Sequence, residues 1–423
     1  MKNAFLIAAT ASGCGKTTLS LGLMRALTRS GVRVQPFKCG PDYIDTQYHR
    51  QATGRDSVNL DLFMASENHV RALFDAHAAD SEVGLVEGAM GLFDGYCKMQ
   101  GSPADLACRL QIPVVLLVDA SSAAYSAAAA LYGFTRFRPE VKVAGVIFNR
   151  VASPRHYAFL LEACRDAGLR SFGYLSKNGK LHIPSRHLGL TLDAASDRDC
   201  FIGLAADEVE AHVDIEGLLA ATCVAQRSGD PPAVCKGSGR VAVARDEAFN
   251  FVYPANLAAF RREIVCFSPL RDRELPEADL VYLPGGYPEL YADGLESNRS
   301  MRAAIKAYVE NGGRLLAECG GMIYLSEEID GKAMCGVFPL KTTMAGARLR
   351  LGYRIVRFPG LTLRGHEFHY SRTCAETALP SVARQFDAGG AAVDTPVYRH
   401  KNAIAGYTHL YWAETDIFKL WNP

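Results

Sequence analysis

Two short stretches of the sequence hold residue types that could do chemistry, and the first is typical of a phosphate-binding loop. The stretch "AATASGCGKTT", residues 8–18, ends in Gly15, Lys16 and Thr17. In such a loop the backbone N–H groups surround the phosphates, the lysine reaches them, and the hydroxyl that follows is available to Mg²⁺. The usual motif starts with a glycine where this chain has Thr10, but an apolar run precedes the loop and leucines at helical spacing follow it. We therefore expect a nucleotide site formed by Thr10, Ser12, Gly13, Gly15, Lys16, Thr17 and Thr18.

The second stretch, "LLAECGGMIYL" from residue 315, is typical of a nucleophile elbow. Leu315 and Leu316 predict a strand that runs into Cys319, and small residues flank the cysteine, as a tight strand-to-helix turn requires. The start of the following helix would lower the pKa of the thiol, and nearby backbone N–H groups would stabilise an oxyanion. We predict that Cys319 is a nucleophile and that Gly285, Gly286 and Gly320 supply the N–H groups.

A cysteine nucleophile needs a base, for which histidine is the usual residue. Three histidines lie downstream of Cys319: His366 and His369 in "GHEFHYS", and His409 in "AGYTHLYW". Spacing alone does not choose among them. We expect at least one of the first two to have a structural role.

Carboxylates follow two predicted strands of the first half of the chain. Asp42 and Asp45 lie in "KCGPDYIDTQYH", residues 38–49, and Glu87 and Asp94 lie in "EGAMGLFDG", residues 87–95. Mg²⁺ prefers oxygen ligands and keeps several waters, so Thr17 with one or two of Asp42, Asp45 and Glu87 would hold it. The alternative for the two aspartates is that they cap turns beside a Gly-Pro pair. We assign Thr17, Asp42 and Glu87 to the metal and leave an acidic residue for the substrate.

The elements that must position these residues alternate between continuous apolar runs and helical patterns, which is typical of a doubly wound parallel sheet. Ligands of such sheets bind outside the carboxyl ends of the strands, where the polar clusters of this chain fall. The strands predicted in the first half are 4–8, 33–37, 83–87, 113–118 and 143–148.

The chain of 423 residues is too long for one core, and its composition changes near the middle. Residues 222–240 are rich in Gly, Pro and Ser and carry no periodicity, which predicts a linker. Beyond it the alternation resumes, with strands predicted at 241–244 and 280–286 and helices at 254–261 and 298–311. We therefore expect two α/β domains, 1–221 and 241–423.

Composition excludes several classes of protein. The formal net charge is +1, which gives no electrostatic reason to bind nucleic acid or an anionic membrane. The longest apolar run, 113–134, contains Asp119 and several serines, and we expect it to split into a strand and a helix rather than span a membrane. The N-terminal apolar run leads directly into the phosphate loop, so we expect no signal peptide.

Twelve cysteines without a C-x-x-C pair predict reduced thiols in the cytoplasm.

Seven ordered blocks of the sequence together resemble the cobyrinic acid a,c-diamide synthase family: "AATASGCGKTT", "FKCGPDYIDTQYH", "VEGAMGLFDG", "IPSRHLGL", "DEAFNFVYPANL", "SPLRDRELPEADLVYLPGGYPE" and "GHEFHYS". The resemblance implies a P-loop domain similar to dethiobiotin synthetase, joined to a class I-like glutamine amidotransferase domain. It implies that Cys319 attacks the side-chain amide of glutamine, that ammonia passes internally, and that ATP activates a carboxylate of a tetrapyrrole as an acyl phosphate.

The resemblance also assigns roles to residues. The family's catalytic histidine maps onto His409, and the position that holds a glutamate in ordinary class I glutaminases is Tyr411, which implies a Cys-His dyad. It places Lys16, Thr17, Asp42, Asp45, Glu87 and Asp94 around ATP, Mg²⁺ and the substrate carboxylate, and we take Asp45 and Asp94 as catalytic.

The implied partners are glutamine and a polycarboxylated tetrapyrrole, with ATP and Mg²⁺ as cofactors, and a homodimer is left open. The alternative substrates are hydrogenobyrinic acid, nickel sirohydrochlorin and sirohaem-type macrocycles. Two alternatives come from other classes: a P-loop ATPase that acts as a regulatory switch, and a glutaminase whose first domain only binds.

Overall fold

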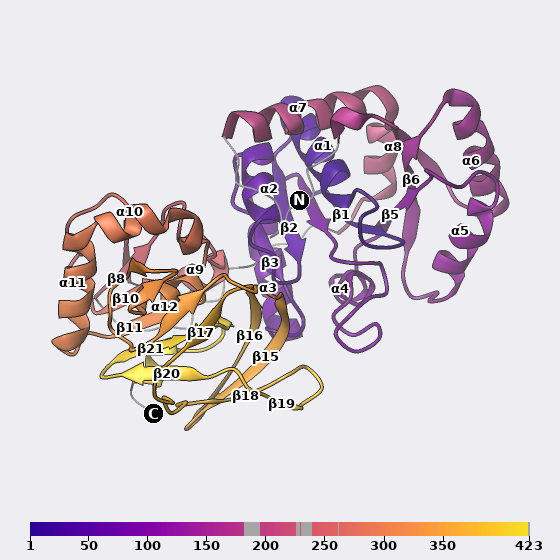
Figure 1. The fold of residues 1–423 in the computed structure, drawn as a ribbon. Coiled ribbons are helices and arrows are strands. Elements are labelled where there is room, and N and C mark those ends of the chain that lie inside the picture. The colour runs from indigo at the N-terminus through magenta and orange to yellow at the C-terminus, as the bar shows by residue number, and fades with distance from the viewer. Residues whose placement is uncertain (182–194, 226–228, 230–238, 261, 422–423) are drawn as a thin grey trace. The chain divides into compact units, whose positions relative to one another are not determined.

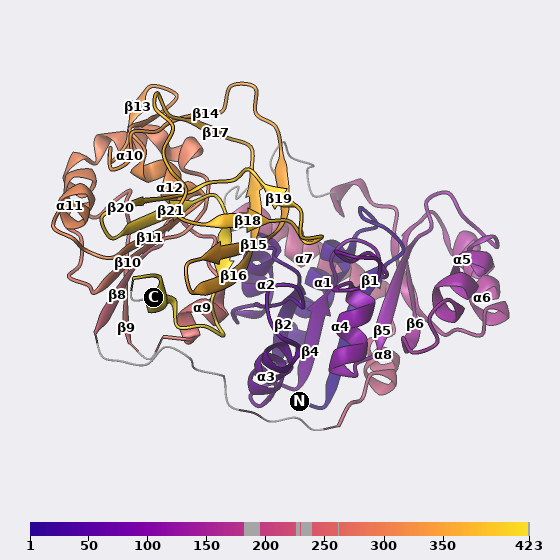
Figure 2. The ribbon, with the colours of Figure 1, turned by 90° about the horizontal axis from the view of Figure 1, so that it is seen from below.

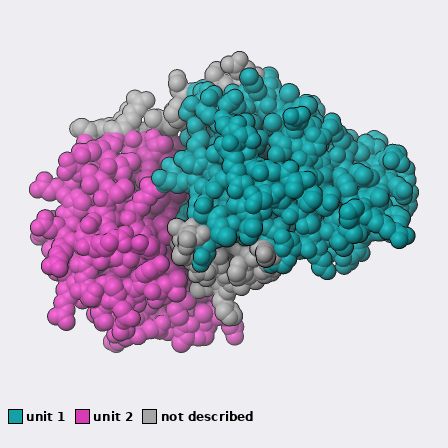
Figure 3. Space-filling view, turned by 90° about the horizontal axis from the view of Figure 1, so that it is seen from above, with its two compact units in different colours: residues 1–62, 66–231 teal, residues 63–65, 232–423 magenta. Residues whose placement is uncertain are grey.

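A computed structural model describes residues 1–423 apart from 182–194, 226–228, 230–238, 261 and 422–423. The chain forms two compact units, residues 1–62 with 66–231 and residues 63–65 with 232–423 (Figure 3). Most of the predicted linker, and the whole of the block "IPSRHLGL", lie outside the described residues. The domain boundaries at 221 and 241 stay a prediction.

Unit 1 is built on a seven-stranded parallel sheet in the order β3-β2-β4-β1-β5-β6-β7. All five predicted strands are present, and two further strands, β3 and β7, were not predicted. The strands are β1 Asn3–Ala9, β2 Val34–Cys39, β3 Val58–Leu60, β4 Val83–Glu87, β5 Val114–Asp119, β6 Val143–Val151 and β7 Ser171–Ser176.

Helices cover both faces of this sheet, which is why its strands are continuously apolar (Figures 1 and 2). One face packs against α1 Lys16–Arg29, α2 Asp45–Thr53, α7 Ala195–His212 and α8 Ile215–Ala221. The remaining helices of the unit are α3 Glu67–Ala78, α4 Pro103–Leu110, α5 Ala127–Arg136 and α6 Pro154–Asp166. The leucines at helical spacing after the phosphate loop, such as Leu19 and Leu23, are buried in the first of these layers.

The strand order of unit 1 places its polar loops at one edge. β1 lies between β4 and β5, with β2 beyond β4, and all of these pairs are parallel. The carboxyl ends of β1, β2 and β4 therefore meet at the edge where doubly wound sheets bind their ligands.

Unit 2 contains a second sheet, in the order β20-β21-β11-β10-β8-β9, whose pairs are parallel except for β20 with β21. Its strands are β8 Arg240–Ala244, β9 Glu263–Phe267, β10 Leu280–Leu283, β11 Leu315–Glu318, β20 Val397–His400 and β21 Ala403–Gly406. The associated helices are α9 Pro254–Ala258, α10 Ala292–Ser297, α11 Arg299–Glu310 and α12 Gly320–Leu325. The predicted strand 280–286 ends early, at Leu283, and the predicted helix 254–261 ends at Ala258.

The two faces of this sheet are covered by different kinds of structure. Ala242 and Ala244 of β8 belong to a core with α11 and α12, whereas Val241 and Val243 face a core formed with antiparallel strands and the C-terminal segment. The strands of unit 2 outside this sheet were not predicted from the sequence, and their pairs are antiparallel except for β12 with β14. They are β12 Glu328–Ile329, β13 Lys332–Ala333, β14 Lys341–Thr343, β15 Arg350–Phe358, β16 Leu361–His369, β17 Arg372–Cys374, β18 Arg384–Phe386, β19 Ala392–Val393 and β22 His409–Tyr411.

The antiparallel strands carry all three candidate histidines. His366 and His369 lie on β16, and His409 begins β22, which pairs with β16 so that His366 and His409 are opposite each other. Among the helices that the structure describes, none is long and apolar enough to cross a membrane.

Candidate functional sites

The phosphate loop connects β1 to α1 in unit 1, and it requires glycine at position 15, directly before the helix. Gly15 caps α1 with a φ of 97°, a left-handed conformation that favours glycine. A Cβ at Gly15 would lie 2.2 Å from Nδ2 of Asn149, which donates a hydrogen bond of 2.7 Å to the carbonyl of Cys14. Arg150 donates to the carbonyl of Gly13 at 3.0 Å. Asn149 and Arg150, near the end of β6, therefore hold the phosphate loop that follows β1.

The first two residues of α1 present the groups that a nucleotide triphosphate requires. The amine of Lys16 donates to the backbone carbonyls of Met90, at 2.5 Å, and Ala11, at 3.3 Å, and burial lowers its pKa. The hydroxyl of Thr17 donates to Glu87 at 2.8 Å. The buried amine of Lys16 is suited to bind a phosphate group, and the hydroxyl of Thr17 beside the carboxylate of Glu87 is suited to coordinate Mg²⁺.

Glu87, at the end of β4, is the centre of a buried charged cluster. It accepts a hydrogen bond of 2.8 Å from the amine of Lys38, and its other oxygen lies 2.8 Å from Nε2 of His49. Lys38 also donates to Asp45 at 2.5 Å. Burial by itself would lower the pKa of Lys38, but Asp45 and Glu87 hold it well above its ordinary value. Burial would raise the pKa of Glu87, but Lys38 and His49 hold it below its ordinary value. Lys38 and Glu87 therefore face each other as charged groups.

The structure brings Lys16, Thr17, Asp45 and Glu87 to this edge of unit 1, and two other predicted residues have different surroundings. One carboxylate oxygen of Asp42 accepts the N–H groups of Ile44 and Asp45, each at 2.8 Å, which is the turn-capping role considered as the alternative. Asp94 is exposed and accepts the N–H of Gly91 at 3.0 Å.

Lys38 and His49 were missed from the sequence although they are the first and last residues of the block 38–49. Within the described residues there is no group of three His, Cys, Asp or Glu side chains arranged to hold a metal ion. A site built on Thr17 and Glu87 would therefore complete its coordination with phosphate and water oxygens, which suits Mg²⁺.

In unit 2 the predicted elbow is present between β11 and α12. Cys319 has a φ of 46° and a ψ of −106°, a conformation that costs free energy for a residue other than glycine and that clusters at active sites. Its N–H donates to the carbonyl of Gly406 at 2.8 Å, which ties the turn to β21. A Cβ at Gly321 would lie 2.1 Å from the carbonyl oxygen of Leu283, so the turn packs too closely on β10 for any larger residue.

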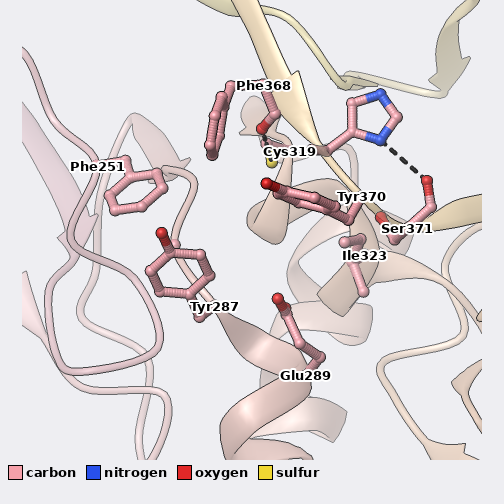
Figure 4. A pocket seen from close by; sticks show the side chains of 10 residues that line it. Phe251, Tyr287, Glu289, Cys319, Ile323, Phe368, Tyr370 and Ser371 are labelled. Carbon is pink, nitrogen blue, oxygen red and sulfur yellow. Dashed lines mark hydrogen bonds between the residues drawn. The ribbon is translucent and has the colours of Figure 1, made fainter. Parts of the chain in front are cut away.

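The thiol of Cys319 lies in a pocket lined by Phe251, Gly286, Tyr287, Glu289, Cys319, Ile323, Phe368, His369, Tyr370 and Ser371 (Figure 4). Gly286 is one of the lining residues. A Cβ at Gly320 would lie 3.0 Å from the backbone nitrogen of Gly286. The predicted oxyanion glycines are therefore close to the nucleophile.

The start of α12 acts on the pKa of this thiol in the predicted direction, but burial outweighs it. Burial raises the pKa of Cys319, and the charge of Glu289 raises it further, whereas the N–H of Gly320 acts in the opposite direction with less effect. α12 has six residues, so its dipole is small compared with the loss of hydration. The thiol is neutral in this structure.

One of the candidate histidines, His369, has surroundings that fit a structural role. The ring nitrogens of His369 lie 2.9 Å from the carbonyl of Ser371 and 2.9 Å from a carboxylate oxygen of Glu367, and the ring stacks on Tyr407 at 3.6 Å. Both nitrogens of His369 are therefore engaged. His366 is buried, which lowers its pKa to about 4.

His409 lies against the glycine pair that borders the pocket. A Cβ at Gly285 would be 2.2 Å from its ring, and its ring centroid is 6.0 Å from that of Phe251, a lining residue. Burial, together with the nearby rings of His366 and His369, lowers the pKa of His409 to about 3. The imidazole is therefore neutral at physiological pH, as a general base must be.

Glu318, which sequence reasoning missed, connects the elbow to the strand that carries His409. One oxygen accepts the N–H of Leu410 at 3.0 Å, and the other accepts the hydroxyl of Tyr282 at 2.7 Å. Burial raises the pKa of Glu318 to about 8. A neutral carboxyl thus joins β10, β11 and β22, and its place directly before Cys319 was the signal available in the sequence.

The fold and the two sites define a class of protein in which a P-loop nucleotide-binding domain is joined to a glutamine amidotransferase domain. Residues 5–190 match the model of the CobQ/CobB/MinD/ParA nucleotide-binding domain. Residues 240–417 match the model of the CobB/CobQ-like glutamine amidotransferase domain.

Relatives match the chain over nearly its whole length. It is 41% identical to the cobyrinate a,c-diamide synthase of Listeria innocua, over 97% of this chain and 96% of that protein. It is 40% identical to the hydrogenobyrinate a,c-diamide synthase of Brucella abortus, over 96% of this chain and 98% of that protein. It is 42% identical to the hydrogenobyrinate a,c-diamide synthase of Rhodobacter capsulatus, over 92% of this chain and 93% of that protein. The chain belongs to the family of cobyrinate and hydrogenobyrinate a,c-diamide synthases.

The raised pKa of Glu318 predicts a specific pH dependence of stability. The folded chain keeps this proton up to about pH 8, whereas the unfolded chain releases it near the ordinary pKa of 4.5, so the folded state binds more protons between these values. The stability contributed by Glu318 should therefore fall as pH rises from 5 to 8, by roughly 4 kcal/mol. Urea unfolding at both pH values should show this loss in the parent chain and not in Glu318→Gln.

Glu376→Gln is the matched control, because the side chain of Glu376 is 88% exposed. It should keep the pH dependence of the parent chain. Equal pH dependence in Glu318→Gln and the parent would show that Glu318 is ionised in the folded protein.

Proposed function

We propose that this chain uses ATP and glutamine to convert the a and c side-chain carboxylates of cobyrinate to amides. The observation that carries the proposal is that a single chain holds both a phosphate loop with a buried Lys38–Glu87 cluster and a nucleophile elbow at Cys319. The first suits transfer of a phosphoryl group, and the second suits release of ammonia from an amide. The names of the relatives support the same chemistry.

In unit 2 Cys319 would act as the nucleophile and His409 as its base. The imidazole takes the thiol proton, the sulfur forms a bond to the amide carbon of glutamine, and that proton passes to the nitrogen as the C–N bond breaks. Backbone N–H groups of Gly286 and Gly320 would stabilise the oxyanion. Water then cleaves the thioester to release glutamate. Because Tyr411 stands where a glutamate orients the histidine in ordinary glutaminases, we propose a dyad.

In unit 1 Lys16 would hold the γ-phosphate while a carboxylate oxygen of the substrate attacks it. The products are ADP and an acyl phosphate, from which ammonia displaces phosphate to form the amide. We propose that Thr17 and Glu87, with Asp42 next to them, hold Mg²⁺, which neutralises the developing negative charge when it is bound. Asp45 and Asp94 would face the substrate carboxylate.

The choice of macrocycle is part of the proposal. The cobyrinate and hydrogenobyrinate enzymes are similar to this chain to nearly the same degree, at 41% and 40% identity. We propose cobyrinate, with hydrogenobyrinate as the alternative. We also propose a cytoplasmic location, because all eleven cysteines in the described part of the chain are free thiols.

Mass spectrometry of reactions with ATP, Mg²⁺ and glutamine tests the substrate directly. Replacement of OH by NH₂ lowers the mass by about one unit for each acyl transfer. We expect two such steps on cobyrinic acid. Two steps on hydrogenobyrinic acid alone would select the alternative. Amidation of a sirohydrochlorin alone would keep the mechanism and change the substrate to a different macrocycle. If none of these macrocycles is amidated, the proposed function is wrong.

The Cys319→Ala variant should separate the two sites. Glutamine-supported amidation should fall by more than about 1,000-fold, since the nucleophile is lost. Amidation supported by ammonium chloride should continue, because unit 1 is unchanged. Cys266→Ala is the control, since this exposed thiol of unit 2 should be dispensable for both activities. Loss of both activities in a folded Cys319→Ala chain would argue against separate sites.

The Lys16→Ala variant should have the opposite effect. Removal of the amine should lower amidation by at least about 100-fold with either nitrogen source, because the charge of the transferred phosphoryl group is no longer balanced. Some glutamine hydrolysis should remain. Lys142→Ala, which changes an exposed lysine of the same unit, should behave as the parent chain. Normal ammonia-supported amidation by Lys16→Ala would exclude Lys16 from the ATP site.

A further inference from the structure

We propose that Glu289 recognises the α-ammonium group of glutamine, so that the pocket accepts an amino acid amide and discriminates against amides that lack the amino group. This inference rests on the proposed glutaminase function of unit 2 and adds a residue that determines its specificity.

The position of Glu289 in the pocket follows from the local chain path. After β10 the chain passes through the glycine pair and enters a short 3-10 turn, Pro288–Tyr291, which places Glu289 three residues beyond Gly286. Gly286, Glu289 and Cys319 all line the same pocket. Figure 4 shows the side chain of Glu289 rising from this turn toward Tyr370 and the thiol. The carboxylate therefore borders the space that the substrate of Cys319 must enter.

The charge of Glu289 is not balanced by the protein in the part of the chain that the structure describes. Its carboxylate forms no salt bridge with a described residue, and the lining residues include no Lys or Arg. Burial raises the pKa of Glu289 to about 7, which places its titration near physiological pH. A half-buried carboxylate in a pocket without a cation is a site for a cationic group of the ligand.

Glutamine carries such a group at the correct end of the molecule. With its amide carbon at the sulfur of Cys319, the α-ammonium is the one cationic group that it can direct to another wall of the pocket. An ammonium–carboxylate hydrogen bond in a partly desolvated site is stronger than one between neutral groups. The ten lining residues include no second carboxylate that could take this role.

The same contact would prepare the nucleophile. Among the charged groups near Cys319, Glu289 has the largest effect on the thiol pKa, ahead of Glu318 and Glu367, and it raises the pKa. An ammonium group at Glu289 would cancel this effect because it supplies the opposite charge. Binding of the correct substrate would therefore make the thiol easier to ionise.

The experiment compares glutamine with 4-carbamoylbutanoate, which is glutamine without its amino group, as substrates of the full chain. For the parent chain, kcat/KM for glutamate or glutarate formation should be about 10- to 100-fold lower with the analogue, as expected for loss of a charged hydrogen bond. In Glu289→Gln, kcat/KM for glutamine should fall by a similar factor. The variant should then turn over the two substrates at rates within about threefold of each other, because no carboxylate remains to distinguish them.

Controls distinguish this result from damage to the fold. Glu376→Gln removes an exposed carboxylate of the same unit and should retain the parent preference for glutamine. Ammonia-supported amidation by Glu289→Gln reports that the chain is folded. If Glu289→Gln keeps the parent preference for glutamine over the analogue, the inference is overturned, whereas absence of glutamine hydrolysis in the parent chain would overturn the proposed function instead.

Alkylation of the thiol gives a second readout that a purely structural role of Glu289 would not change. Removal of the neighbouring charge should make Cys319 react with iodoacetamide up to about tenfold faster at pH 8, since a pKa lower by one unit gives about ten times more thiolate. The Cys319→Ala chain supplies the background from the other thiols. An unchanged rate in Glu289→Gln would contradict the proposed proximity of the two groups.

Discussion

Both sites depend on one constraint, which is that a buried parallel strand must end in a tight turn whose polar groups are satisfied. In unit 1, β4 ends at Glu87, and this buried carboxylate is held by Lys38, His49 and Thr17. In unit 2, β11 ends at Glu318, which is held by Tyr282 and by the N–H of Leu410. In each unit the strand-end glutamate joins neighbouring strands and so fixes the groups that would do the chemistry.

Burial acts on the charged groups of the two units with different results. Lys38 and Glu87 are both charged, because the attraction between them offsets the lost hydration. In unit 2, burial raises the pKa of Glu318 to about 8 and lowers that of His409 to about 3, so that both groups are neutral near pH 7. Glu367 of the same unit stays ionised, because His369 and Arg354 lower its pKa to about 2. A buried group of either unit therefore keeps its charge where a partner of opposite charge or a hydrogen bond offsets the lost hydration.

The sequence predicted local features well and long-range pairing poorly. The phosphate loop, the five strands around it and the elbow at Cys319 follow from residue type and spacing within about 15 residues, which is the scale at which turns and periodicity act. The antiparallel strands that carry the histidines depend on pairing across the chain, as when β16 meets β22 more than 40 residues later, and no local motif shows that pairing. The charged partners Lys38 and His49 were missed for the same reason, since their role appears only when β2 and α2 meet β4. The sequence did not predict that burial outweighs the helix start at Cys319, because burial cannot be read from one motif.

The burial of Cys319 and His409 affects when the thiol reacts. Transfer of a proton from Cys319 to His409 would create two charges in a pocket where burial has already raised the pKa of the thiol and lowered that of the imidazole, so both partners oppose the transfer. The negative charge of Glu289 adds to this opposition, as it faces the sulfur that must become negative. A ligand that brings a positive charge to Glu289 removes this part of the barrier, and an amide without one does not. The electrostatics of the pocket would thus favour ionisation of the thiol in the presence of an amino acid amide, and limit reaction with other amides or with water.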